Sequence, residues 1–172
     1  ISQQIPTFVL TGSVDEATRS RILSKPIIDY IPKETVQSFD YVGKLATRLL
    51  HNHLTKILIV DDAKSSRIYI NSLLKRHNFH VLTAENGRDA LAVIKQNPDI
   101  KVVVTDNEMP VMNGINLVSA LRQQFSVEQL AIIGVSASDT STLSARFLKT
   151  GANDFLTKPF SPEEFYTRIF RN

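Results

Sequence analysis

Short apolar runs alternate with helix-period stripes along the chain from residue 55 to its end. Five of the runs are predicted strands: residues 56–60, 79–83, 102–104, 130–135 and 154–157. Three of them are apolar without alternation, which is typical of parallel strands covered on both faces. The runs at 79–83 and 154–157 are less apolar, so we expect them nearer the edges of a sheet.

The segments between these strands carry apolar residues at the spacing i, i+3, i+4, i+7, which predicts helices that pack one face on a sheet. The stripes are Ile70/Leu73/Leu74/His77, Gly87/Ala90/Leu91/Ile94, Gly114/Leu117/Val118/Leu121 and Pro162/Phe165/Tyr166/Ile169. A fifth helix is predicted over 140–149, with Leu143 and Phe147 facing inward. The resulting (βα)5 pattern predicts an α/β fold, a doubly wound five-stranded parallel sheet with right-handed crossovers.

Composition excludes several classes of protein. The chain has 172 residues, 42% of them hydrophobic and 22% charged, and it lacks an apolar run long enough to span a membrane. A net charge of +3 without a basic cluster does not indicate a nucleic-acid partner. The absence of Cys excludes disulfides and thiolate metal sites, and it fits a cytoplasmic location. Because the chain starts Ile1-Ser2-Gln3-Gln4, we expect a piece of a longer protein.

Five polar residues follow the carboxyl ends of predicted strands, where open α/β sheets bind their ligands: Asp61, Asp62, Asp106, Ser136 and Lys158. Each alone has a structural explanation as a turn former, a helix cap or a surface residue. Together they predict three close carboxylates, and two such charges 4 Å apart repel by roughly 4 kcal/mol at an effective dielectric near 20. Hard oxygen ligands at an open site suit Mg²⁺, whose charge would balance the cluster together with the lysine. A carboxylate so placed can attack a phosphoryl group, and the serine hydroxyl can donate a hydrogen bond to the product.

These residues resemble the receiver domain of two-component response regulators over residues 55–172. The family's acidic pair matches Asp61-Asp62, its phospho-acceptor matches Asp106 in Asp106-Asn107-Glu108-Met109-Pro110, and its switch hydroxyl and lysine match Ser136 and Lys158. The resemblance implies a flavodoxin-like strand order and phosphoryl transfer to Asp106 from a histidine kinase or a histidine phosphotransfer protein. It also implies Mg²⁺ bound directly by Asp62 and Asp106, by Asp61 through water, and by the backbone carbonyl of Glu108. The family's aromatic switch is here Phe155, which lacks the usual hydroxyl, so we expect switching to depend more on Ser136.

The first fifty residues repeat the last fifty at a shift of 125 positions. The matched pairs are Thr11 with Ser136, Arg21 with Arg146, Asp29 with Asp154, Tyr30 with Phe155 and Lys33 with Lys158. The shift predicts strands at 8–10 and 27–31 and a helix over 36–50. Residues 1–52 are therefore interpreted as a βαβα half-unit, the back half of a second receiver without a phospho-acceptor. We expect it to pack on the complete domain or on a second copy. Coincidence of two βα units and a partly disordered remnant are the alternatives.

The junction His51-Asn52-His53 is predicted to be a solvated linker and not a metal site, since no further ligands lie nearby in the sequence.

The leading functional hypothesis is a signalling module that catalyses only its own phosphorylation and dephosphorylation. We expect it to control an output outside these residues, a diguanylate cyclase by analogy, and to form a homodimer through a face with Leu143, Phe147, Phe155 and Phe165. A phosphatase of the haloacid dehalogenase type would need a second acid two residues after its nucleophile, which Asp61-Asp62-Ala63-Lys64 does not provide. A phosphorylation-independent scaffold is disfavoured by the acidic site in residues 55–172, but not in residues 1–52.

Overall fold

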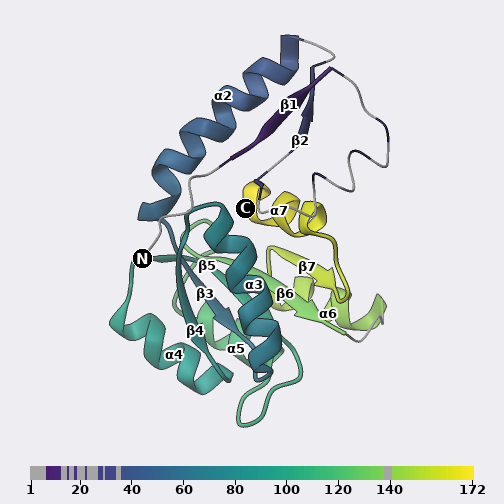
Figure 1. Ribbon diagram of the computed structural model, residues 1–172. Helices are drawn as coiled ribbons and strands as arrows, with labels where there is room; N and C mark the ends of the chain where they lie inside the picture. Colours follow the sequence, from purple (N-terminus) through teal and green to yellow (C-terminus); the bar gives the residue numbers. More distant parts are fainter. Residues whose placement is uncertain are drawn as a thin grey trace. The chain divides into compact units, whose positions relative to one another are not determined.

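The computed structural model (Figure 1) describes residues 7–12, 15, 18, 22, 27–28, 30–33, 36–137 and 141–172. The chain forms two compact units. One contains residues 1–55 and 72–80, and the other contains residues 56–71 and 81–172. No helix among the described residues is long and apolar enough to cross a membrane.

A five-stranded sheet forms the centre of the second unit. Its strands lie in the order β4 (His80–Ala84), β3 (Lys56–Val60), β5 (Ile100–Asp106), β6 (Ala131–Ser136) and β7 (Asp154–Thr157). The pairs β3–β5, β5–β6 and β6–β7 are parallel. This is the order 2-1-3-4-5 along the sequence of the unit, and it confirms the predicted doubly wound sheet.

Helices cover both faces of this sheet (Figure 1): α3 (Lys64–Arg76), α4 (Gly87–Gln96), α5 (Gly114–Arg122), α6 (Ser141–Thr150) and α7 (Pro162–Arg171). Helix α5 contacts both α4 and α6, so these three helices lie on the same face of the sheet. On the other face Tyr69 of α3 meets Phe160, which stacks on Phe165 of α7. All five predicted helices are present, and α7 is capped by Ser161, which forms a capping box with Glu164.

The core of the second unit lies between the sheet and its helices. It includes Leu58 and Val103 on the strands and Leu117 and Phe147 on the helices. Complete burial of such a side chain contributes about 1.5–3 kcal/mol. The predicted dimer face is corrected here, because all four of its side chains are buried: Leu143, Phe147, Phe155 and Phe165. These side chains hold the core together and are not available to a partner in this structure.

In the first unit β1 (Val9–Thr11) pairs in parallel with β2 (Tyr30–Pro32). Helix α2 (Val36–His51) places Leu45 and Leu49 in a small apolar cluster with Ile28 and Ile31. The second strand begins at Tyr30, later than predicted. Ile27 and Ile28 precede the paired residues, although Ile28 is buried. The matched positions Arg21 and Asp29 lie outside the described residues.

The two strand pairs β1–β2 and β6–β7 have the same register at the shift of 125 residues. Val9 pairs with Tyr30 as Gly134 pairs with Phe155, and Thr11 pairs with Pro32 as Ser136 pairs with Thr157. The flanking hydrogen bonds also match. The Ile28 N–H donates to the Thr7 carbonyl (2.7 Å) and the Lys33 N–H to the Thr11 carbonyl (2.7 Å), as Asn153 donates to Ile132 (2.8 Å) and Lys158 to Ser136 (2.8 Å).

The junction after α2 is not a solvated linker throughout, which corrects the prediction. A 3₁₀ turn covers Asn52–Leu54, and the Asn52 side chain is buried and donates to the His77 carbonyl at 2.8 Å. The amide of Asn78 donates to the Leu49 carbonyl at 3.3 Å. His51 and His53 are exposed, as predicted. The turn between α3 and β4 is thereby attached to the end of α2.

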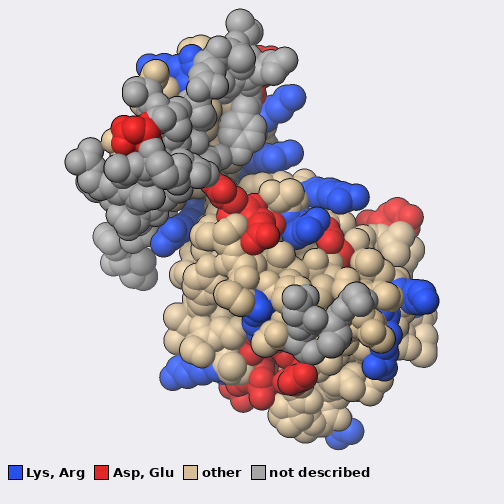
Figure 2. Space-filling model, turned by 90° about the vertical axis from the view of Figure 1, so that its right-hand side faces the viewer, with Lys and Arg blue, Asp and Glu red and all other residues tan. Residues whose placement is uncertain are grey.

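Charged side chains of both signs are mixed over the face shown in Figure 2. Figure 2 shows Lys and Arg separated by uncharged residues and by Asp and Glu over much of the face in view. This distribution agrees with the small net charge of +3, and it gives no support to a nucleic-acid surface on that face.

Candidate functional site

The Lys158 ammonium group brings two carboxylates together at one edge of the central sheet. Its Nζ lies 2.7 Å from Asp61 Oδ2 and 2.7 Å from Asp106 Oδ1. The three residues come from the carboxyl ends of β3, β5 and β7. Only 3% of the Asp61 side chain and 10% of the Asp106 side chain are exposed, against 23% for Lys158. The charges therefore interact largely out of water, where each contact is stronger than at the surface.

Asp61 is fixed by the turn that leads into α3. The Ala63 N–H donates to Asp61 Oδ1 at 2.9 Å, and the Ser66 hydroxyl donates to Oδ2 at 2.5 Å. Its own N–H donates to the Ala84 carbonyl of β4 at 3.2 Å. These bonds hold both the side chain and the backbone of Asp61.

Arg67 anchors the backbone of the acidic pair. Its Nη1 donates to the carbonyls of Asp61 (2.7 Å) and Asp62 (2.9 Å), and its Nη2 contacts Glu85 at 2.6 Å. Arg67 was not predicted as a site residue. A cation in the first turn of a helix is unfavourable beside the helix dipole, but its position does not show which groups it contacts.

Asp106 sits in a tight turn at the end of β5. Its Oδ2 accepts a hydrogen bond from the Glu108 N–H at 2.6 Å, and the Thr105 hydroxyl donates to its carbonyl at 2.9 Å. A Cβ at Gly114 would overlap the Asp106 carbonyl and come within 2.9 Å of the Phe147 ring. Gly114 was predicted to be part of an apolar helix stripe. In the structure, its lack of a side chain allows the backbone to lie close to the Asp106 carbonyl and the Phe147 ring.

The site holds more negative charge than its surroundings favour. Burial raises the pKa of Asp106 above its usual value, the contact with Lys158 opposes this rise, and the Asp61 charge adds to it. Burial alone would lower the pKa of Lys158, but its hydrogen bonds to Asp106 and Asp61 outweigh burial and raise that pKa. Lys158 is therefore a firmly held cation beside a carboxylate whose charged form is costly.

Ser136 is buried at the end of β6, one position beyond Val135, which is paired with Asp106. Phe155 in β7 is buried and its ring centroid lies 5.3 Å from that of Phe147. The side chains of Asp62 and Glu108 are exposed. Among the described residues, the ion pairs of Lys158 are with Asp61 and Asp106. In the described part of the chain, no three His, Asp or Glu side chains are gathered closely enough to hold a metal as they stand.

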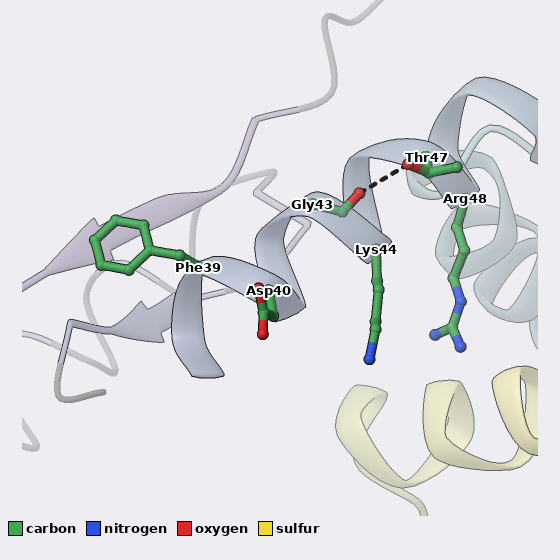
Figure 3. A pocket seen from close by; sticks show the side chains of 6 residues that line it. All are labelled: Phe39, Asp40, Gly43, Lys44, Thr47 and Arg48. Atoms are coloured by element: carbon green, nitrogen blue, oxygen red, sulfur yellow. Dashed lines mark hydrogen bonds between the residues drawn. The ribbon is translucent and has the colours of Figure 1, made fainter. Parts of the chain in front are cut away.

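A separate hollow lies on the exposed side of α2 (Figure 3), and it is lined by Phe39, Asp40, Gly43, Lys44, Thr47 and Arg48. The Thr47 hydroxyl donates to the Gly43 carbonyl at 2.9 Å, which is a bond within the helix. All the lining residues belong to one helix, so the hollow lacks convergent groups from other elements that would orient a ligand.

Comparisons with known proteins agree with this geometry. The response regulator receiver domain family matches residues 57–170. A CheY chemotaxis protein homologue of Campylobacter jejuni is 38% identical over 109 residues, covering 63% of this chain and 84% of that protein. The rice two-component response regulator ORR7 is 31% identical over 108 residues, and this chain spans about half of its length (51%).

Two solved structures extend the comparison. A crystal structure of a two-component response regulator/GGDEF domain protein matches 97% of this chain and 68% of its own chain, at 41% identity and a TM-score of 0.88. The CheY of Borrelia burgdorferi, solved as a complex with CheX, BeF₃ and Mg, matches 68% of this chain and 87% of its own at 27% identity and a TM-score of 0.64. Because the family match covers residues 57–170, the chain belongs to the response regulator receiver domain family.

Proposed function

We propose that Asp106 accepts a phosphoryl group from a histidine kinase or a histidine phosphotransfer protein. The observation that carries this proposal is the buried Asp106 carboxylate held 2.7 Å from the Lys158 ammonium at the end of the central strand. In the reaction a carboxylate oxygen forms a bond to phosphorus, and the bond from phosphorus to the donor nitrogen breaks with its electron pair leaving on the donor. Lys158 offsets the charge on the phosphoryl oxygens as they approach.

The donor set fits Mg²⁺, which prefers oxygen ligands and keeps several waters. We assign the carboxylates of Asp62 and Asp106 and the backbone carbonyl of Glu108 as direct ligands, with Asp61 acting through water. The raised pKa of Asp106 supports a further cation, because burial and Asp61 both disfavour its charge. When bound, the metal would supply charge neutralisation to the phosphoryl oxygens. The Borrelia CheY structure, named as a complex with BeF₃ and Mg, supports this assignment by similarity.

Phosphorylation would act on the rest of the domain through Ser136 and Phe155. Ser136 ends the strand beside β5 and can donate its hydroxyl to the phosphoryl group. Phe155 packs on Phe147, so a shift in β6 and α6 would change the packing of this ring pair. We propose that the exposed surface over α6, β7 and α7 then binds a partner or a second copy. The GGDEF domain named for the solved relative suggests the class of output that this cytoplasmic module controls.

For the first unit, we propose that residues 1–52 are the back half of a receiver-like domain without a phospho-acceptor. The shared register of β1–β2 and β6–β7 supports this assignment, as do the matching hydrogen bonds at Lys33 and Lys158. Two unrelated βα units would share a parallel pairing, but equal spacing between their paired residues would then be a coincidence.

The test is incubation with acetyl phosphate and Mg²⁺, followed by intact mass measurement. We expect one added phosphoryl group on the wild type and none on Asp106→Asn. The matched control is Asp99→Asn, which removes an exposed carboxylate at a distance from the site and should leave phosphorylation unchanged. Equal phosphorylation of wild type and Asp106→Asn, or none on either, would reject the assignment.

A further inference from the structure

The hollow on α2 has the form that receives a side chain from a facing helix. Four of its lining residues occupy positions i, i+3, i+4 and i+7 of the helix: Asp40, Gly43, Lys44 and Thr47. Residues at this spacing surround the hole into which a second helix inserts a side chain in knobs-into-holes packing. Gly43 keeps the hole open, since a Cβ there would meet no neighbouring atom within 4 Å. The hollow therefore fits a protein helix better than a small ligand.

The same helix carries a side chain of the kind that fills such a hole. Phe39 is 60% exposed, although an aromatic ring of this size stabilises a protein mainly when it is buried. It precedes Gly43 by four residues, so the two positions lie on the same face of α2, about 6 Å apart along its axis. One face of α2 thus presents both a hole and an exposed ring.

Opposite charges follow the same spacing on the adjacent side of the helix. Asp40 and Lys44 are exposed, and their side chains extend from the same side of α2 as that of Arg48 (Figure 3). In the sequence the carboxylate is next to Phe39, and the ammonium group is next to Gly43. The exposed ring is therefore accompanied by an acid and the hole by a base, so the surface is complementary to itself.

An antiparallel pair of these helices satisfies both features. When residue 39 of one copy faces residue 43 of the other, two-fold symmetry makes the reverse true as well, so each ring enters the hole of the other copy. The same alignment brings the Asp40 carboxylate of each copy towards the Lys44 ammonium of the other. A parallel pair in register would instead place Phe39 against Phe39 and Asp40 against Asp40, which opposes like charges and leaves the holes without a ring.

We propose that the α2 hollow is the docking site for α2 of a second copy of this chain, with Phe39 in the hole at Gly43 and Asp40 paired with Lys44 across an antiparallel two-fold interface. This homodimer goes beyond the proposed function, because it needs no phosphoryl group. A single helix face is smaller than the roughly 800 Å² that each partner contributes to a standard interface. We therefore expect a weak dimer, with a Kd between about 10 μM and 1 mM.

Sedimentation velocity of the 172-residue chain without a phosphoryl donor measures this dimer across the expected range of Kd. We expect Phe39→Ala and Gly43→Leu each to weaken association at least about tenfold, because the first removes the ring and the second fills the hole. Leu50→Ala is the matched control and should leave association unchanged. Leu50 is 71% exposed on the same helix, but in this alignment it lies opposite a level before residue 36, where the helix of the other copy begins.

Charge exchange tests the antiparallel orientation. Asp40→Lys and Lys44→Asp should each weaken the dimer, because each places like charges opposite one another. The double variant should restore association to within about threefold of the wild type, and this recovery is possible only for a chain that folds. A chain that stays monomeric up to about 1 mM, unchanged association in Phe39→Ala, or a double variant as weak as the single ones overturns the proposal.

Repeating the sedimentation with acetyl phosphate and Mg²⁺ separates this interface from the proposed function. The α2 dimer should be present with and without the phosphoryl donor. A dimer that forms only after phosphorylation overturns the proposal, because that behaviour belongs to the surface over α6, β7 and α7. Phosphorylation of Asp106 is measured by intact mass, and its failure would leave the α2 dimer as expected.

Discussion

At the scale of single residues, the site is a balance of buried charges. Asp61 and Asp106 share one ammonium group, and burial raises the pKa of Asp106 in spite of that contact. A phosphoryl acceptor benefits from this arrangement, because its charged form is not over-stabilised before the reaction. The same balance makes each member of the triad sensitive to substitution.

Lys158→Met removes the cation that both carboxylates share. We expect the free energy of unfolding at pH 7 to fall by about 2–4 kcal/mol, since two nearly buried carboxylates lose their partner. The loss should shrink at acidic pH, because the raised pKa of Asp106 favours protonation of that carboxylate. Urea unfolding measures the effect, and Lys149→Met, an exposed lysine of α6, is the control that should change stability little. Equal stability of the two variants at pH 7 would contradict the buried contact.

Arg67→Met releases the carbonyls of Asp61 and Asp62 from their shared donor. We expect phosphorylation by acetyl phosphate to slow by about tenfold, because the acidic turn loses its fixed geometry. Samples of the reaction are stopped at successive times, and the phosphorylated fraction is measured by intact mass spectrometry. Glu85→Gln removes only the charge of the other partner of Arg67 and should have a smaller effect. A wild-type rate in Arg67→Met would mean that the turn is held without this side chain.

Sequence alone could predict the contacts of Asp61, Asp106 and Lys158, because parallel strands deliver their carboxyl ends to the same edge of a sheet. The sequence could not predict the hydrogen bonds of Ser66 and Arg67 to the Asp61-Asp62 turn. Hydrogen bonds from a helix to nearby carbonyls and carboxylates leave no spacing pattern in a sequence. Nor could the sequence predict that Asp62 is exposed while Asp61 is buried, because the two residues are adjacent and of the same type.

At the scale of elements, glycine positions show where backbone and side chains approach each other. A Cβ at Gly114, the first residue of α5, would meet the Asp106 carbonyl and the Phe147 ring, whereas a Cβ at Gly43 in α2 meets nothing within 4 Å. The two glycines are therefore a matched pair for one substitution.

We expect Gly114→Ala to lower the free energy of unfolding by about 1–3 kcal/mol, because the methyl group forces neighbours to move. Gly43→Ala, on an exposed helix position, should instead raise it by about 0.5–1 kcal/mol through lower backbone entropy in the unfolded chain. Thermal and urea unfolding of both variants measure the contrast. Similar effects of the two substitutions would argue against the close packing at Gly114.

Strands β3, β5 and β6 of the second unit were predictable because unalternated apolar runs are short and well bounded. The start of β2 was not, since Ile28 is buried without being part of the paired strand. The dimer face predicted at Phe155 and Phe165 was wrong, because an apolar stripe does not distinguish a core face from a partner face. The other prediction for Phe165, packing on the sheet, agrees with its burial. Asn52 was missed for the opposite reason, since a polar residue between two histidines gives no sign that it is buried.

At the scale of the whole molecule, stability should depend on pH through His77. Burial, with a smaller contribution from Arg76, lowers the pKa of His77 to about 4 from 6.5. The unfolded chain therefore binds a proton before the folded chain does. Stability should fall as the pH drops from about 6.5 to about 4, by about 3 kcal/mol in total at roughly 1.4 kcal/mol per pKa unit.

Urea unfolding of wild type and His77→Leu at pH 7.5 and pH 4.5 measures this dependence. The wild type should lose clearly more unfolding free energy between the two pH values than the variant does. The raised pKa of Asp106 acts in the opposite direction, since its protonation relieves a costly charge, and it is present in both proteins. Equal losses in the two proteins would contradict a buried neutral His77.

The whole account depends on which carboxylate takes the phosphoryl group. The most direct measurement is peptide mapping by mass spectrometry after reaction with acetyl phosphate and Mg²⁺ and reductive trapping of the acyl phosphate. The geometry predicts that the trapped site is Asp106 alone, with no label on Asp61 or Asp62. Label on either of these neighbours, or on a carboxylate elsewhere in the chain, would contradict the proposed function.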